Sequence, residues 1–124
     1  MIWSLPALAI FGVTIWFVNG IRQIGAVSSG DPIDARSGTA LLMIDLQTVF
    51  WDAGIFDETA RENAKAQVLS EVEAAKSSGL PVIAVRQEWS IPSTKAVVRL
   101  LMKGQAIEGT PGTELATPFE DLAD

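Results

Sequence analysis

The sequence predicts an α/β protein, the N-terminal part of a doubly wound, parallel, three-layer sheet, preceded by a transmembrane helix. The first 21 of its 124 residues carry no charged side chain. Two short apolar runs, at 39–44 and 82–85, flank a segment with helical periodicity. Strand, helix and strand in this order form a βαβ unit, whose strands are parallel and whose crossover is right-handed.

Residues 1–21 are predicted to be a membrane anchor. A helix of about 20 apolar residues spans the hydrocarbon core of a bilayer, and only small or polar residues interrupt this run before Asn19. Trp3 lies near one end of the run and Trp16 near the other, as interfacial aromatic residues do. Two alternatives stay open: a signal peptide cleaved near 26–28, where the sequence reads Ala-Val-Ser, and a buried core helix.

Residues 22–38 are predicted to be a linker, because Gly, Ser, Asp and Pro are frequent in them. The nearby cations Arg22 and Arg36 both follow the apolar run. Cations near a membrane span favour its cytoplasmic side. The sequence therefore favours a single-pass membrane protein whose soluble part lies in the cytoplasm.

The soluble part, residues 39–124, opens with the apolar run 39–44, which lacks alternation and is predicted to be a strand buried on both faces. Residues 50–56 are expected to form a loop with large apolar anchors. A helix is predicted over 58–78, with Asp57 as its N-cap and Gly79 after its end. The run 82–85 is the second predicted buried strand. A further helix is expected over 94–103 and a turn over 108–113.

The composition excludes several functions. Nine Lys and Arg residues stand against 15 Asp and Glu residues, which gives a net charge of -6, and no segment gathers cations. Nucleic-acid binding needs several cations on one face, so no nucleic-acid partner is expected. The chain has no cysteine and no histidine. Because these are the side chains that most often bind transition metals, neither a metal site nor another cofactor is expected.

The stretch 40–50, ALLMIDLQTVF, resembles the opening motif of the isochorismatase-like family of cysteine hydrolases, an apolar strand that ends in Asp-x-Gln-x-x-Phe. Two further stretches agree in order and spacing. GLPVIAVRQE at 79–88 resembles the second strand of the family, and GTPGTE at 109–114 resembles the loop before its third strand. The resemblance covers about residues 39–124 and implies a doubly wound sheet flanked by helices.

The resemblance implies amidase-like chemistry on a small amide, imide or vinyl-ether substrate. In this family a cysteine attacks the substrate, an aspartate acts as its base, and a lysine sets the charge of the site. A thiol needs such help because it is mostly protonated at neutral pH. The aspartate carries over to Asp45, whereas the lysine and cysteine of the family follow the 109–114 loop and have no counterpart up to Asp124. The chain as given is therefore expected to be inactive.

The metal-binding histidines of the nicotinamidase branch also have no counterpart near 86–90. This favours the metal-free branch, or a metal bound by residues outside this sequence. The candidate substrate-binding residues are Gln47, Phe50, Trp51 and Trp89, because substrate pockets are mostly apolar with a few polar groups. Each candidate has a structural alternative. Asp45 is otherwise a cap at a strand end, Gln47 packs a turn, and the aromatic residues fill a core or its rim.

Two strands make too small a parallel sheet for a stable domain. We therefore expect further strands, either from a longer form of this polypeptide or from another chain, which is compatible with a homo-oligomer. The alternative function is a non-catalytic interaction module that completes its sheet with a partner chain. The expected partners of the hydrolase are a small-molecule substrate and the membrane, through residues 1–21.

Overall fold

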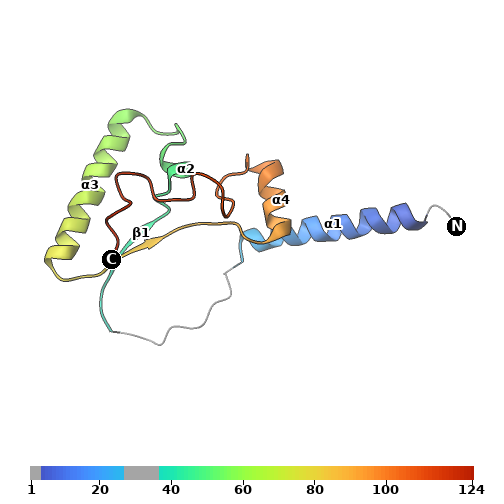
Figure 1. Ribbon diagram of the computed structural model, residues 1–124, viewed down its shortest axis with the longest axis horizontal. Coiled ribbons are helices and arrows are strands. Elements are labelled where there is room, and N and C mark those ends of the chain that lie inside the picture. Colours follow the sequence, from blue (N-terminus) through green and yellow to red (C-terminus); the bar gives the residue numbers. More distant parts are fainter. Residues whose placement is uncertain (1–3, 27–36) are drawn as a thin grey trace. The chain divides into compact units, whose positions relative to one another are not determined.

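The computed structural model describes residues 4–26 and 37–124. Its elements are α1 (Ser4–Ile24), β1 (Leu41–Ile44), α2 (Thr48–Trp51), α3 (Glu58–Ser77), β2 (Val82–Val85) and α4 (Pro92–Leu101) (Figure 1). The chain divides into two compact units. The helical unit combines Met1–Pro32 with Glu88–Glu108, and the sheet unit combines Ile33–Gln87 with Gly109–Asp124. Glu88–Glu108 therefore groups with the N-terminal helix.

The N-terminal helix α1 contains the stretch Leu5–Ile24, which is long and apolar enough to cross a membrane, although a signal sequence has the same properties. Its large apolar side chains are exposed, with 74% of Leu5 and 65% of Phe11 accessible. The structure therefore does not bury α1 as a core helix. The first residues of the predicted linker, up to Ile24, belong to α1, and residues 27–36 lie outside the described residues.

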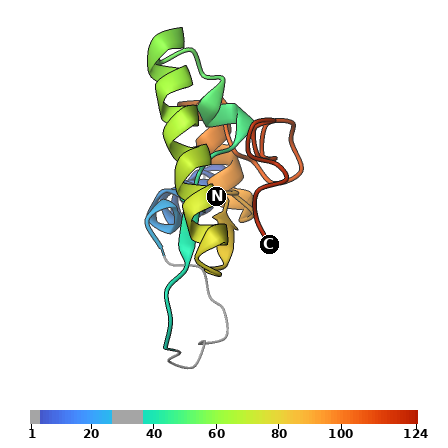
Figure 2. The ribbon, with the colours of Figure 1, turned by 90° about the vertical axis from the view of Figure 1, so that its left-hand side faces the viewer.

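Helix α4 packs against α1 in the helical unit. It begins at Pro92, whose fixed φ suits the first helical position. Its buried residues are Ser93, Thr94, Val97 and Val98. Helix α4 runs across the C-terminal end of α1 rather than alongside it (Figures 1 and 2). The helix that the sequence predicts over 94–103 is present, two residues closer to the N-terminus.

In the sheet unit, β1 and β2 form a two-stranded parallel sheet in which Leu41 lies opposite Val82. Helix α3 connects the strands and covers one face of the sheet. The core between them contains Met43, Val72, Ala75 and Val82. This arrangement is the predicted βαβ unit.

The ends of α3 follow the predicted signals. The Asp57 carboxylate accepts a hydrogen bond from the Ala60 N–H at 2.8 Å, which satisfies one of the free donors of the first turn. Gly79 follows the helix with φ 70°, in the left-handed region that ends many helices. Helix α3 ends at Ser77, one residue before the predicted end.

The prediction that both strands are buried on both faces is wrong. Leu42, Ile44, Ile83 and Val85 remain 51%, 59%, 46% and 41% exposed. They alternate with the residues that face α3, so they share the second face of the sheet. No described element of the sheet unit covers that face, and the described residues show a mixed α/β unit rather than a three-layer sheet.

The loop predicted over residues 50–56 is also corrected in part. Phe50 and Trp51 lie in the short helix α2, which has no side-chain cap at its N-terminus. Its first N–H groups bond instead to carbonyls of the 109–114 loop. A helix that depends on a distant loop leaves no local signal in the sequence.

Candidate functional site

Asp45 lies directly after β1, at the carboxyl end of the parallel sheet, as the sequence predicts. Its N–H donates to the Val85 carbonyl at 3.0 Å. Its φ of 56° lies in the left-handed region, which is costly for residues other than glycine, although Asp tolerates it better than most. The side chain is exposed, and within the described part of the chain its carboxylate makes no hydrogen bond or ion pair. The carboxylate is therefore open to an incoming group.

Gln47, two residues later, is completely buried. Its Nε2 donates to the Thr113 carbonyl at 2.8 Å and to the Gln87 carbonyl at 3.1 Å. Its Oε1 accepts from the Gln87 N–H at 2.6 Å. The carboxamide therefore joins the turn after β1, the end of the β2 segment and the 109–114 loop.

The 109–114 loop lies against the first turn of α2. The Thr48 N–H donates to the Glu114 carbonyl at 3.0 Å, and the Val49 N–H donates to the Gly112 carbonyl at 2.9 Å. Gly112 has φ 96°, and a Cβ at this position would lie 3.1 Å from the Val49 Cβ. Glycine is required here both by the backbone conformation and by the close approach of α2.

The Glu114 side chain folds back over its own loop. Its Oε2 accepts from the Gly112 N–H at 2.8 Å. Hydrogen bonds from its own N–H and from that of Gly112 lower the pKa of Glu114 below its ordinary value. The Thr48 hydroxyl and the positive charge of Arg86 act in the same direction, while burial acts against them. Arg86 also donates to the Thr113 carbonyl at 3.3 Å.

The aromatic candidates on α2 take part in packing. Phe50 and Trp51 are both half-buried. The Trp51 ring meets the buried Phe119 ring edge-on, with centroids 4.8 Å apart. The Arg61 guanidinium also lies over the Trp51 ring, 5.6 Å from the ring centroid. An edge-on aromatic contact and a cation over an aromatic ring both stabilise a folded unit, so Trp51 contributes to the packing of the sheet unit.

Trp89 belongs to the helical unit, whereas Asp45, Gln47, Phe50 and Trp51 belong to the sheet unit. Trp89 is half-buried, and its backbone N–H donates to the Ala106 carbonyl at 2.8 Å. The sequence did not single out Thr113 and Gly112, which the structure places around Gln47 and α2. The Gly-Thr-Pro-Gly-Thr composition of their loop predicts a turn, but it does not show what the loop contacts.

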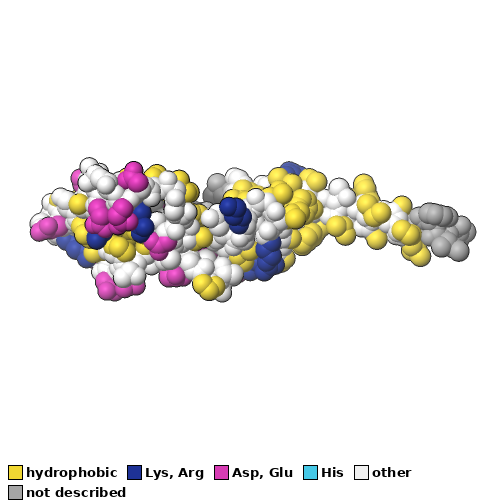
Figure 3. Space-filling model, turned by 90° about the horizontal axis from the view of Figure 1, so that it is seen from above, with side chains coloured by type: hydrophobic (Ala, Val, Ile, Leu, Met, Phe, Trp, Pro, Cys, Tyr) yellow, Lys and Arg dark blue, Asp and Glu magenta, His cyan; other side chains and the backbone are white. Residues whose placement is uncertain are grey.

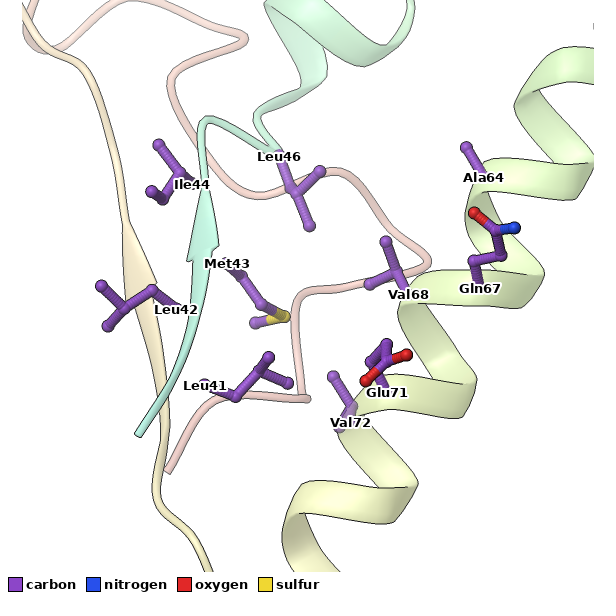
Figure 4. Close-up of a pocket in the computed structure, with 10 residues that line it drawn as sticks. All are labelled: Leu41, Leu42, Met43, Ile44, Leu46, Ala64, Gln67, Val68, Glu71 and Val72. Atoms are coloured by element: carbon purple, nitrogen blue, oxygen red, sulfur yellow. The ribbon is translucent and has the colours of Figure 1, made fainter. Parts of the chain in front are cut away.

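An apolar groove of about 380 Å³ lies between β1 and α3. Met43, Leu46 and Val68 point into it, while Gln67 and Glu71 lie on its α3 side (Figure 4). The residues that line it are Leu41, Leu42, Met43, Ile44, Leu46, Ala64, Gln67, Val68, Glu71 and Val72. Asp45 does not line this groove. The sequence did not predict it, because a sequence does not show which strand edge stays open.

Among residues 4–26 and 37–124, no three Asp or Glu side chains are grouped to hold a metal ion. No protein-family model matches the sequence, and comparisons with curated proteins and with solved structures give no match. The likeness to isochorismatase-like hydrolases therefore stays a prediction based on the residues of the three stretches.

Proposed function

We propose that the sheet unit is the N-terminal part of an isochorismatase-like cysteine hydrolase that α1 tethers to the membrane, with Asp45 as the catalytic base. The main support is that the three stretches with family resemblance meet at one buried side chain. Gln47 belongs to the first stretch and bonds to Gln87 of the second and Thr113 of the third. A single functional site is expected to bring together stretches that lie far apart in the sequence, as these hydrogen bonds do.

Asp45 has the position and the exposure that a base requires. Ligands of open α/β sheets bind beyond the carboxyl ends of the strands, which is where Asp45 follows β1. Its left-handed backbone is a costly conformation of the kind that gathers at functional sites. The carboxylate takes the proton of a thiol, and the resulting thiolate attacks the electrophilic carbon of a small amide, imide or vinyl-ether substrate. The bond from that carbon to the leaving nitrogen or oxygen then breaks as the Asp45 carboxyl returns the proton to the leaving atom, and water hydrolyses the bond to sulfur.

The thiol is proposed to come from residues outside this sequence, because the chain has no cysteine. The charge-setting lysine, which in the family follows the 109–114 loop, is proposed to come with it. The same polypeptide adds the further strands of a doubly wound, three-layer sheet. Phe50 and Trp51 are proposed to form apolar walls of the pocket, while Gln47 holds the turn that presents Asp45. The tether places this enzyme at the cytoplasmic face of a membrane.

Reconstitution with the missing groups tests this proposal. The chain is co-expressed with the later strands, lysine and cysteine of an isochorismatase-like hydrolase, and turnover of small amides is measured. Asp45→Asn should lower turnover at least about a hundredfold, as the loss of a general base does. Asp121→Asn, at another exposed carboxylate of the sheet unit, is the matched control and should retain turnover. Equal turnover in the two variants would show that Asp45 is not the base.

The second candidate function is an interaction module that completes its sheet with a partner chain. Among the described residues, no strand pairs with the second edge of β1, which favours this function. The peptide groups of Leu41 and Asp45 face β2, so those of Leu42 and Ile44 point to the other edge. An unpaired edge beside an apolar groove is a template for a further strand.

The coding sequence beyond Asp124 separates the two candidates. An open frame that continues into an apolar strand, a lysine and later a cysteine supports the hydrolase. A stop codon directly after Asp124 supports the interaction module.

A further inference from the structure

Helix α4 is fixed against the C-terminal end of α1 by a close backbone contact. Gly20 is buried, and a side chain at this position would collide with the Ser93 carbonyl. The Thr94 hydroxyl donates to the Gly20 carbonyl at 3.1 Å in a buried hydrogen bond. Only glycine allows two helices to approach so closely. Helix α4 is therefore held at one level along α1.

This level coincides with the end of the apolar surface of α1. Large exposed apolar side chains continue along the helix as far as Ile21, one residue past Gly20. Asn19 precedes this end, and Arg22 and Gln23 follow it. A helix that crosses a bilayer leaves the hydrocarbon core where its polar residues begin. Gly20 then lies at the membrane interface. Because α4 runs across α1, it extends along this interface instead of away from it (Figures 1 and 2).

The C-terminal end of α4 carries an exposed apolar cluster. Leu100, Leu101 and Met102 are 71%, 64% and 38% exposed. Arg99 and Lys103 flank the cluster and are also exposed. Figure 3 shows Lys and Arg side chains next to apolar ones on the face of the molecule that it draws. Apolar side chains bordered by cations are typical of helices that lie on a lipid surface.

We propose that the end of α4 is a membrane-surface contact, in which Leu100, Leu101 and Met102 insert below the headgroups while Arg99 and Lys103 bind anionic lipid phosphates. The inference rests on the proposed tether but is independent of the hydrolase chemistry. A lipid surface is the occupant because α1 brings α4 to the interface and because the flanking charges are complementary to an anionic leaflet.

Lys95, on the same helix, is a weaker candidate for lipid binding because its Nζ already pairs with Glu108 at 2.9 Å. The contact would give the helical unit a second attachment beside α1. Two attachments restrict the tilt of this unit relative to the membrane plane more than a single span does.

Single engineered cysteines test the proposal, because the chain has none of its own. The full chain is placed in vesicles of phosphatidylcholine and phosphatidylglycerol and carries one environment-sensitive fluorophore, at Leu101→Cys, at Val13→Cys within α1 or at Ser77→Cys at the end of α3. We expect a quencher deep in the acyl chains to reach Val13→Cys. A quencher near the headgroups should reach Leu101→Cys, and neither should reach Ser77→Cys.

The outcomes distinguish the tether from the surface contact. If Val13→Cys is quenched and Leu101→Cys is not, the surface contact is overturned and the tether stands. If Val13→Cys is not quenched, the tether itself is overturned. If Leu101→Cys is shielded from a water-soluble quencher but unaffected by the lipid-borne one, a protein partner covers α4 and the proposal is also overturned.

The flanking charges give a second, independent measurement. Arg99→Gln and Lys103→Gln should each weaken lipid quenching of the Leu101→Cys label on anionic vesicles, by about fivefold in the partition constant per cation. The effect should disappear on vesicles of phosphatidylcholine alone. Lys76→Gln in the last turn of α3 is the matched control and should leave the quenching unchanged. Equal quenching in all variants on anionic vesicles would overturn the role of the two cations.

Discussion

Gln47 holds together three segments that are distant in the sequence. Its partners Gln87 and Thr113 lie 40 and 66 positions further along the chain. A buried carboxamide is unfavourable unless its polar groups are paired, and here backbone groups pair both the amide nitrogen and the oxygen. The Gln47 side chain therefore stabilises the fold of the sheet unit, in addition to the substrate-binding role proposed for it.

Replacement of Gln47 by Ala should destabilise the sheet unit by about 2–4 kcal/mol, because backbone groups of Gln87 and Thr113 lose their buried partner. Urea unfolding of the full chain, followed by circular dichroism, measures the change. Gln67→Ala, at an exposed position of α3, should change the stability by less than about 0.5 kcal/mol. Identical unfolding midpoints for the two variants would contradict the role assigned to Gln47.

The lowered pKa of Glu114 makes the loop sensitive to acid. Because the folded state favours the ionised carboxylate, this group stabilises the fold above its unfolded pKa. The contribution is lost as the pH falls through the lower folded pKa. A titration of the carboxyl carbon by NMR should show a midpoint below the ordinary glutamate value, and Glu114→Gln should remove this part of the acid sensitivity. The exposed Glu73→Gln on α3 serves as the control; a Glu114 midpoint above the ordinary value would refute the prediction.

At this scale the sequence predicted where Asp45 lies but not how its backbone is bent. The end of an apolar strand is a local signal, whereas a positive φ depends on what the following turn must reach. The same limit applies to Gln47. Its partners are main-chain groups of other segments, so the sequence could not decide between a pocket role and turn packing.

Among the elements, the βαβ unit was the most predictable. Apolar runs, the Asp57 cap and Gly79 are local features that mark its strands and the helix between them. The exposed face with Leu42 and Ile44 was not predictable, since an apolar run shows that burial is favoured but not which element provides it. Helix α2 was missed because carbonyls of a distant loop stabilise its first turn.

Gly112→Ala should lower stability by about 2–3 kcal/mol, because it adds a crowded contact with Val49 to the cost of a left-handed backbone. Gly109→Ala is the matched variant: it has φ 76° but open space around its Cβ position. It should lose only about 1 kcal/mol. The difference between the two urea midpoints measures the cost of the contact between the loop and α2. Equal midpoints would mean that this contact does not contribute to stability.

Gly20→Ala should loosen α4 from α1. Overpacking costs about 1–3 kcal/mol. This cost should raise the fraction of molecules in which α4 has separated from α1 by about tenfold. Tryptic cleavage at Arg99 and Lys103 should therefore become faster. Gly12→Ala, on the same helix with no neighbour within 4 Å, should leave the cleavage rate unchanged. Equal rates for the two variants would argue that the Gly20 contact does not hold α4.

At the scale of the whole molecule, the protein consists of two compact units, and one of them contains the apolar N-terminal helix. The sequence predicted the apolar helix and the α/β class. It did not predict that Glu88–Glu108 groups with α1, because this grouping depends on the contact between Gly20 and Ser93, which no local pattern encodes. The resemblance to hydrolases likewise predicts a chemistry that depends on groups beyond this chain.

The proposed topology predicts the accessibility of engineered cysteines in cells. Ser77→Cys in the sheet unit should react with a membrane-impermeant maleimide only after the cells are permeabilised. A cysteine added ahead of Met1 should react in intact cells. Reaction of Ser77→Cys in intact cells would reverse the orientation, and a mature chain that lacks α1 by mass spectrometry would identify a cleaved signal.

The long reach of the Gln47 hydrogen bonds also affects the order of events during translation. The loop carbonyl that the Gln47 carboxamide binds belongs to Thr113, 66 residues downstream. The growing polypeptide therefore leaves the ribosome for some time with this amide group incompletely paired. Helix α1 emerges long before and is available to the insertion machinery. Delivery to the bilayer would thus precede completion of the sheet unit, which matures as an already tethered nascent chain.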